Sequence, residues 1–244
     1  MLISRKKFII DGIYMTKTNS TENKERRKIV RACLIHVPFD GWTQKSLDLA
    51  AKDCGFQSAD IARILPRGVT QAIEIYSELA DDDMVSAFET KMKDGHNAPN
   101  GVTAKIKFMI IVRLEQALPQ KEVVRKTAQY LLNPRNLQLS QKLLYQTIDL
   151  IWRTTGDHST DISFFTKRGL LGALYSSTIL YFLADNSGSI ENTSSFLDRR
   201  LKEISFIPQI TKPLEKQAKF AFSGLNGVVS SLAKNMSRQM AKRR

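Results

Sequence analysis

The chain has 244 residues, of which 42% are hydrophobic and 25% are charged, and its formal net charge is +13. This composition is ordinary for a globular protein of one large or two small domains and excludes a chain that is disordered throughout. Its apolar runs are too short for a signal peptide, and none reaches the unbroken length of about 18 residues that a membrane-spanning helix needs.

The positive charge lies at the two ends of the chain. Residues 1–31 hold nine Lys and Arg against three acids, and residues 199–244 hold eleven against two. The stretch between them is close to neutral. We therefore expect the main body to be nearly uncharged, with basic segments on either side of it.

Apolar residues recur at helical spacing along almost the whole chain, and Gly or Pro falls between the periodic segments, so we predict an all-α fold. The expected organisation is a disordered segment over 1–22, a three-helix part over 23–67, a larger ligand-binding and dimerisation part over 68–205, and an amphipathic helix within 206–244. We expect helices over residues 23–37, 43–54, 58–65, 68–93, 102–118, 121–132, 137–155, 162–184, 190–205 and 212–241.

The stretch from His36 to Leu65 has the helix, turn and helix order of a DNA-reading motif, with a first helix that ends near residues 36–38. Residues 43–68 carry four basic side chains against three acidic ones, and the expected recognition helix offers one Arg and one Asp. Phosphate neutralisation supplies most of the affinity for DNA. We therefore expect a degenerate motif that does not bind DNA, with KERRK (24–28) as the only candidate for phosphate contacts.

The segment 162–184 is apolar almost all round and contains several small residues, so we expect it to be buried in the core or at a dimer interface with helix 190–205. Together with helix 137–155 it predicts a mostly apolar cavity, with a few polar groups to orient a ligand. The candidate lipid-binding residues are Tyr145, Ile148, Gly172, Tyr175, Thr178 and Tyr181.

The sequence contains no pattern typical of a catalytic or metal site. The three histidines lie in separate segments, and HExxH, GxSxG and GxGxxG are absent. We interpret the run Asp81–Asp83 as a solvated helix face, and Cys33 and Cys54 as buried small side chains in a reducing compartment. We expect no enzyme, no cofactor and no metal.

Residues 212–241 predict a basic amphipathic helix. Apolar residues form one stripe, and basic residues lie mainly outside it, as in helices that lie in a membrane interface. The expected membrane-binding residues are Phe222, Leu225, Val229, Leu232, Lys219 and Lys234. Docking of this helix on the protein's own body or on a partner subunit is the alternative.

Several motifs together resemble the coenzyme Q nine family. They are HVPFDGWT (36–43), LPRG (65–68), RLE (113–115), Trp152, GDHSTDISFFTKR (156–168) and FLDRR (196–200). The resemblance implies a tetracycline-repressor-like fold in a dimeric, membrane-associated protein of ubiquinone biosynthesis. It also implies that the protein binds isoprenoid quinone intermediates and presents them to the demethoxyubiquinone hydroxylase.

One departure from the family's motif lies at Phe164-Phe165, where the family commonly has Trp-Tyr. We predict a partner-docking patch here, and buried core is the alternative for both rings. The patch consists of Trp152, Asp161, Phe164, Phe165 and Arg168. The expected location is the inner face of a membrane, first in a bacterial cytoplasm and alternatively in a mitochondrial matrix. A ligand-responsive transcription regulator of the same fold is the alternative function.

Overall fold

The computed structural model describes residues 20–156 and 162–203, with the side chains of residues 22–156 and 167–203. All regular structure in this part of the chain is helical, which confirms the all-α prediction. The labelled helices are α1 (Ser20–Asp40), α2 (Gln44–Asp53), α3 (Ser58–Ile64), α4 (Gly68–Asp94), α5 (Val102–Ala117), α6 (Lys121–Leu131), α7 (Leu137–Thr154) and α8 (Ile162–Ala184). Short 3-10 turns lie at η1 (Leu118–Gln120) and η2 (Pro134–Asn136), and residues 191–203 form a further helix.

Within the described residues, the predicted helices agree with the observed ones to within a few residues, and the first helix differs most. Helix α1 continues through Pro38 to Asp40, so the expected end near residues 36–38 is wrong. The chain then turns at Gly41, whose φ of 68° is a conformation that favours glycine. Thr43 caps α2 by accepting a hydrogen bond from the Ser46 backbone, and the Ser46 side chain completes a capping box.

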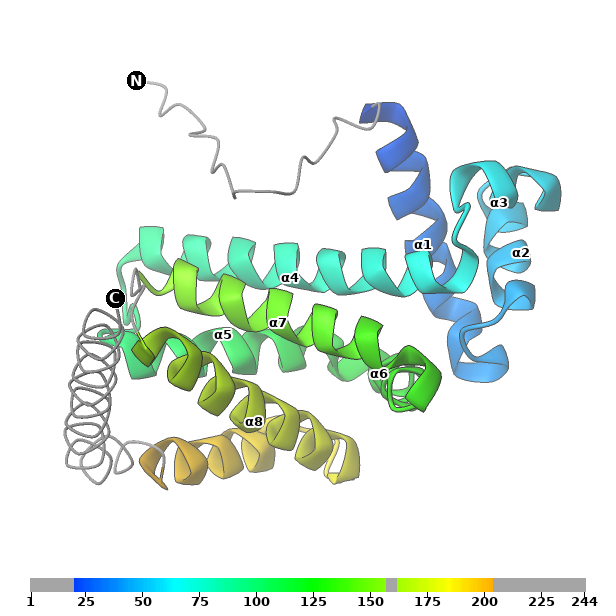
Figure 1. Ribbon diagram of the computed structural model, residues 1–244. Helices are drawn as coiled ribbons and strands as arrows, with labels where there is room; N and C mark the ends of the chain where they lie inside the picture. The colour runs from blue at the N-terminus through cyan, green and yellow to red at the C-terminus, as the bar shows by residue number, and fades with distance from the viewer. Residues whose placement is uncertain (1–19, 157–161, 204–244) are drawn as a thin grey trace, which may run out of the picture.

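The long helix α4 joins the two parts of the molecule. Figure 1 shows α1, α2 and α3 gathered at one end of α4, and α5 and α7 running along the rest of it. Helix α8 packs against α7, and the helix over residues 191–203 lies beside α8 (Figure 1). This order of three short helices followed by longer ones is the predicted plan.

The core has two clusters. The first lies mainly among α1, α2, α3 and the start of α4, but it also contains Val123 of α6 and Leu139 and Leu143 of α7. The second lies among the later part of α4, α5, α7, α8 and residues 191–203. Since α6 and α7 contribute to the first cluster, the three-helix part shares its core with the larger part.

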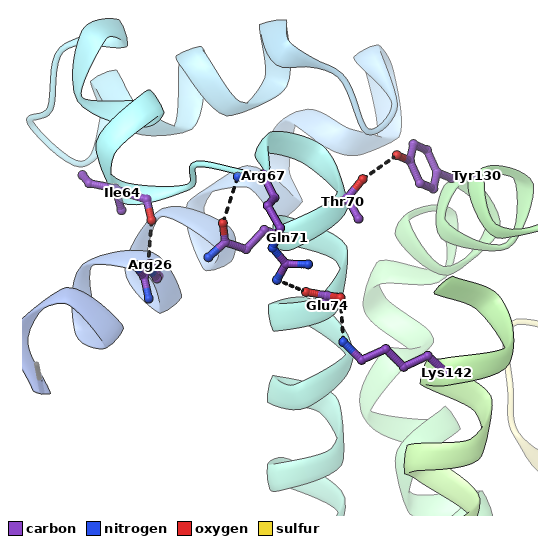
Figure 2. Close-up of polar contacts among 8 residues, drawn as sticks. All are labelled: Arg26, Ile64, Arg67, Thr70, Gln71, Glu74, Tyr130 and Lys142. Atoms are coloured by element: carbon purple, nitrogen blue, oxygen red, sulfur yellow. Dashed lines mark hydrogen bonds and ion pairs between the residues drawn. The ribbon is translucent and has the colours of Figure 1, made fainter. Parts of the chain in front are cut away.

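Polar contacts reinforce this junction (Figure 2). Glu74 of α4 is buried, and it accepts hydrogen bonds from Arg67 and from Lys142 of α7. Burial raises the pKa of Glu74, but these two hydrogen bonds outweigh it, and the pKa lies below its usual value. Nearby, the hydroxyls of Thr70 and Tyr130 lie 3.2 Å apart and link α4 to α6. The three-helix part is therefore joined to the body by partly buried polar contacts as well as by apolar contacts.

A candidate ligand cavity in the helical body

A cavity of about 260 Å³ lies between α4, α5, α6, α7 and α8. Its wall is mainly apolar, with polar groups gathered from a few positions. The apolar residues are Ala80, Leu114, Ala117, Val124, Ala128, Leu131, Leu132, Leu143, Leu144, Ile179 and Leu180. The others are Tyr76, Ser77, Arg113, Thr127, Ser140, Thr147, Tyr175 and Ser176. An apolar lining with few polar groups is typical of small-molecule sites, whose volumes start at about 300 Å³.

One end of the cavity holds a buried charged pair. The Arg113 guanidinium donates through Nη1 to Asp81 Oδ1 at 2.5 Å and through Nε to the Tyr175 hydroxyl oxygen at 2.7 Å. Thr147 Oγ1 donates to the same carboxylate, 3.1 Å from each oxygen. The side chains of Arg113 and Asp81 are each only 11% exposed. The cavity therefore borders a buried ion pair, whose two opposite charges compensate each other.

Asp81 corrects the interpretation of the acidic run. Asp82 and Asp83 are exposed and form ion pairs with Arg27 and Arg31, as expected of a solvated face. Asp81 is buried instead, so its assignment to that face is wrong. The signal was present in the sequence, because Asp81 precedes Met84 and Phe88 by three and seven residues and so lies on the buried stripe of α4.

Burial raises the pKa of several groups around this ion pair. It raises the pKa of Asp81, although Arg113 and Thr147 act in the opposite direction. It also raises the pKa of the Tyr175 hydroxyl, against the effect of Arg113, and raises that of Tyr76 to about 12. Both tyrosines are therefore protonated across the physiological pH range and present neutral hydroxyls.

A second cavity of about 220 Å³ lies on the other side of the same wall, toward α1. Tyr76, Ala80, Arg113 and Ala117 line both cavities. The ring of Tyr76 also packs against that of Trp42, with ring centres 5.6 Å apart. The polar end of the main cavity therefore reaches toward the three-helix part.

Trp42 connects that part to the cavity wall directly. Its indole N–H donates to Thr127 Oγ1 at 2.8 Å, and Thr127 lines the cavity from α6. Trp42 is itself buried in the turn before α2. Trp42, in the turn before α2, therefore packs against Tyr76 of α4 and hydrogen-bonds to Thr127 of α6.

Two apolar residues of the lining are exposed at the surface. They are Leu132 at the end of α6 and Leu180 of α8, with 73% and 58% of their surfaces exposed. Leu137, at the start of α7, is also exposed. Large apolar side chains in such positions allow an apolar chain to leave the cavity without meeting a polar rim.

Of the residues expected to bind lipid, only Tyr175 lines the cavity. Ile148 is buried in the second core cluster, and Thr178 is buried and donates to the Leu174 carbonyl oxygen. Tyr181 stacks on Phe196 of the following helix, with ring centres 4.4 Å apart. Tyr145 is exposed on α7, and Gly172 is buried in α8. The structure thus brings together a different set around Tyr175, and a binding role for the other five stays a prediction.

The expected docking patch lies only partly within the described residues. Arg168 is buried and donates from Nε and Nη2 to Asp149 Oδ1 at 2.9 and 2.7 Å. The half-buried Trp152 donates its indole N–H to the Lys167 carbonyl oxygen, and the Lys167 ammonium lies over its ring. These contacts join α7 to α8. Asp161 and the side chains of Phe164 and Phe165 lie outside the described residues, so docking here stays a prediction.

The basic cluster 24–28 is engaged with the protein itself. Arg26 donates to the Ile64 carbonyl oxygen at 2.7 Å (Figure 2), and Lys28 donates to the Cys54 carbonyl oxygen at 3.2 Å. Arg27 pairs with Asp82, as described above. The guanidinium of Arg63 lies 3.8 Å from Glu25, so the one basic residue of α3 also has an acidic neighbour.

Two further expectations have only partial answers. Cys33 is buried, whereas Cys54 is half-buried.

The helix expected over residues 212–241, with Phe222, Leu225, Val229, Leu232, Lys219 and Lys234, lies outside the described residues. Within residues 20–156 and 162–203, none of the helices combines the length and hydropathy needed to cross a bilayer. The same residues contain no group of three or more His, Cys, Asp or Glu that could hold a metal ion.

Comparison of the sequence with known proteins shows to which family the chain belongs. A model of the COQ9 family matches residues 137–207, which include α7 and α8. The mitochondrial ubiquinone biosynthesis protein COQ9-B of Xenopus laevis is 30% identical over 89% of this chain and 74% of its own length. The human mitochondrial ubiquinone biosynthesis protein COQ9 is 25% identical over 89% of this chain and 69% of its own length.

The fold has a solved counterpart. A TetR transcriptional regulator from Nitrosomonas europaea superimposes with a TM-score of 0.59 over 75% of this chain and 99% of its own, at 16% identity. At that identity the likeness shows the fold alone, and it confirms the expected tetracycline-repressor-like plan. The sequence relationships add the family: the chain belongs to the COQ9 family of ubiquinone biosynthesis proteins.

Proposed function

We propose that this protein is a lipid-binding accessory protein of ubiquinone biosynthesis, which holds isoprenoid quinone intermediates and presents them to the demethoxyubiquinone hydroxylase. The observation that carries the proposal is the cavity among α4 to α8, whose lining is mainly apolar and includes a few polar side chains. A ring with a long isoprenoid tail likewise combines a large apolar part with a few polar groups. The names of the relatives, which are ubiquinone biosynthesis proteins, support the pathway.

The size of the cavity defines how such a ligand is held. At about 260 Å³ it is slightly smaller than most sites for drug-sized ligands. A ring and the first part of a tail fit such a volume, and a long tail must extend past Leu132 and Leu180, which are exposed at the surface. On this proposal the rest of the tail stays in a membrane, where the predicted helix 212–241 holds the protein against an anionic surface.

The proposal assigns no catalysis to this chain. The hydroxylase supplies the chemistry, and this protein supplies the substrate. We also propose that the protein forms a homodimer. We place it on the matrix side of a mitochondrial membrane, because the relatives are named mitochondrial. Those names give no support to the bacterial cytoplasm that the sequence analysis put first.

A DNA-binding regulator is the alternative, and the contacts of the basic residues argue against it. Arg26, Arg27 and Lys28 are engaged with the protein's own carbonyl and carboxylate groups. These contacts fix the three side chains on the protein and use part of the hydrogen-bonding capacity that phosphate binding would need. We expect only weak, salt-sensitive DNA binding, and a sequence-specific complex at nanomolar concentration and physiological salt would favour the regulator.

The presentation step is tested with the hydroxylase and a long-chain substrate embedded in vesicles. We expect the wild-type protein to raise the rate of hydroxylation, and Ala128→Trp, which fills the cavity from α6, to remove this effect. Ala62→Trp introduces the same side chain at an exposed position of α3 and serves as the control. Equal stimulation by the wild-type protein and by folded Ala128→Trp would contradict the proposal.

The docking patch has a separate test. On the proposal, the double change Phe164→Ala, Phe165→Ala abolishes association with the hydroxylase while the protein still carries lipid. Loss of several kcal/mol of stability, as expected on deletion of buried Phe side chains, would assign both rings to the core instead.

A further inference from the structure

The loop that joins α4 to α5 ends in the dipeptide Asn100-Gly101. It covers residues 95–101, between Asp94 at the end of α4 and Val102 at the start of α5. Asn100 and Gly101 are both exposed. Neither the side-chain amide of Asn100 nor the backbone N–H of Gly101 forms a hydrogen bond with another described residue. Both groups are therefore open to solvent and are not held by a partner.

The conformation at the start of α5 favours glycine. Gly101 has a φ of 82°, which L side chains rarely adopt, and it directly precedes the first turn of the helix. A Cβ built on Gly101 would meet no atom within 4 Å, so the space on that side of its backbone is free of protein. Neither a side chain of its own nor a neighbour on that side therefore shields the Gly101 nitrogen.

We infer that Asn100 is a site of spontaneous deamidation, at which the folded protein converts this asparagine into aspartate and isoaspartate. The nucleophile is the backbone nitrogen of Gly101, after it has lost its proton to solvent. It attacks Cγ of Asn100, so that a bond from nitrogen to Cγ forms and the bond from Cγ to Nδ2 breaks. The Nδ2 group takes up a proton from water and leaves as ammonia, and a cyclic succinimide remains.

Water completes the reaction by opening the succinimide. Attack at Cγ breaks the new bond and gives aspartate, whereas attack at the backbone carbonyl carbon gives isoaspartate, in which the chain continues through Cγ. The sum of the steps consumes water and releases ammonia, and nothing is oxidised or reduced. The inference is independent of the proposed function, because the reaction needs only this loop and water.

Asn97 lies in the same loop and provides a comparison within the molecule. It is exposed as well, but the residue that follows it is Ala98, which is half-buried. The Cβ of Ala98 hinders the approach of its own nitrogen to Cγ of Asn97. Of the two asparagines in this loop, Asn100 should therefore react first.

The two products change the start of α5 in different ways. The first turn of this helix contains no acidic residue, and its N-cap forms no side-chain hydrogen bond. Aspartate at position 100 adds a negative charge beside the positive end of the helix, where such a charge is stabilising. Isoaspartate adds a methylene group to the backbone at the same place. Since α5 contributes Arg113 and Leu114 to the cavity wall, either product modifies a helix that forms the site.

Peptide mapping of the full-length protein by mass spectrometry tests the inference. Trypsin cleaves after Lys93 and Lys105, so Asn97 and Asn100 leave in one peptide and are distinguished by its fragments. After incubation under native conditions, we expect the mass gain of deamidation at Asn100 and not at Asn97. The rate should rise about tenfold from pH 7 to pH 8, because the deprotonated fraction of a weak acid rises by that factor below its pKa. The Asn-Gly pair at 226–227 lies in a different tryptic peptide.

Two variants at position 100 separate the chemistry from the fold. Asn100→Gln keeps the amide but lengthens the side chain, which disfavours ring closure, so the mass gain should be lost over the same time. It should leave Tm unchanged, because the Asn100 side chain has no partner among the described residues. Asn100→Asp imitates one product and should raise Tm by about 1–3 °C.

A synthetic peptide of residues 94–105 shows whether the fold protects the site. We expect Asn100 to react at a similar rate in this peptide and in the folded protein. An Asn100 that stays unmodified in the folded protein while the peptide reacts would overturn the inference. Equal reaction at Asn97 and Asn100, or no reaction in either sample, would overturn it as well.

Discussion

Replacing Arg113 by Met should destabilise the protein far more than the loss of one surface charge. The side chains of Arg113 and Asp81 are 11% exposed and lie 2.5 Å apart, so the variant leaves a carboxylate buried with only Thr147 to bond it. Removing one partner of a buried pair costs about 3–5 kcal/mol. For a chain of this size, each kcal/mol lowers Tm by roughly 2–4 °C. A fall of about 10 °C is therefore expected.

The loss should also depend on pH. The folded pKa of Asp81 is already raised above the unfolded value of about 3.9, and removal of Arg113 takes away a group that lowers it. A carboxyl with a raised folded pKa stabilises the fold at low pH and loses that contribution as pH rises through the folded pKa. The difference in unfolding free energy between the wild-type protein and Arg113→Met should consequently be smaller at pH 5 than at pH 8.

Urea unfolding followed by circular dichroism at the two pH values measures both effects. The double variant Arg113→Met, Asp81→Asn removes the unpaired charge and keeps an acceptor for Thr147, so it should recover a large part of the lost stability and have a weaker pH dependence. A loss below about 1 kcal/mol for Arg113→Met, equal at both pH values, would refute the burial of this pair.

Three further changes test other parts of the account. Glu74→Gln should cost about 1–3 kcal/mol at neutral pH through the weakened bond with Arg67. The folded pKa of Glu74 is lowered, so the difference in unfolding free energy between the wild-type protein and Glu74→Gln should depend on pH. It should be fully present above the unfolded pKa of about 4.3 and disappear as the pH falls through the folded pKa. Measuring stability at a series of acid pH values tests this. Trp42→Phe should lower the unfolding free energy by about 1 kcal/mol through loss of the indole hydrogen bond, and a thermal melt identical to that of the wild-type protein would contradict the link between α2 and α6. Leu225→Glu with Val229→Glu should abolish co-sedimentation with anionic liposomes, and unchanged sedimentation would show that the C-terminal segment is not the membrane anchor.

Periodicity and turn residues predict most of the secondary structure. Apolar residues recur along the helices, and left-handed glycines such as Gly41 and Gly95 lie directly beyond helix ends. The same reasoning placed the end of α1 too early, since it took the stretch around Pro38 as a boundary. Helix α1 instead contains Pro38 and continues to Asp40, directly before the left-handed Gly41.

The site was harder to predict because it depends on how the helices cross. Tyr175 and Tyr181 lie six residues apart on α8, yet one faces Arg113 and the other stacks on Phe196. Asp81 was taken as a surface residue because charge usually indicates exposure, and its partner lies 32 residues away on α5. No local pattern connects Trp42 to Thr127, which lies 85 residues further along the chain.

The central claim is that the cavity carries an isoprenoid quinone, and extraction of the purified full-length protein with organic solvent tests it most directly. Mass spectrometry of the extract should identify a quinone-ring lipid in the wild-type protein and in the exposed-site control Ala62→Trp. The same lipid should be missing from folded Ala128→Trp, whose new side chain occupies the cavity. A wild-type extract without any quinone or isoprenoid lipid, or an equal amount of it in Ala128→Trp, would contradict the account.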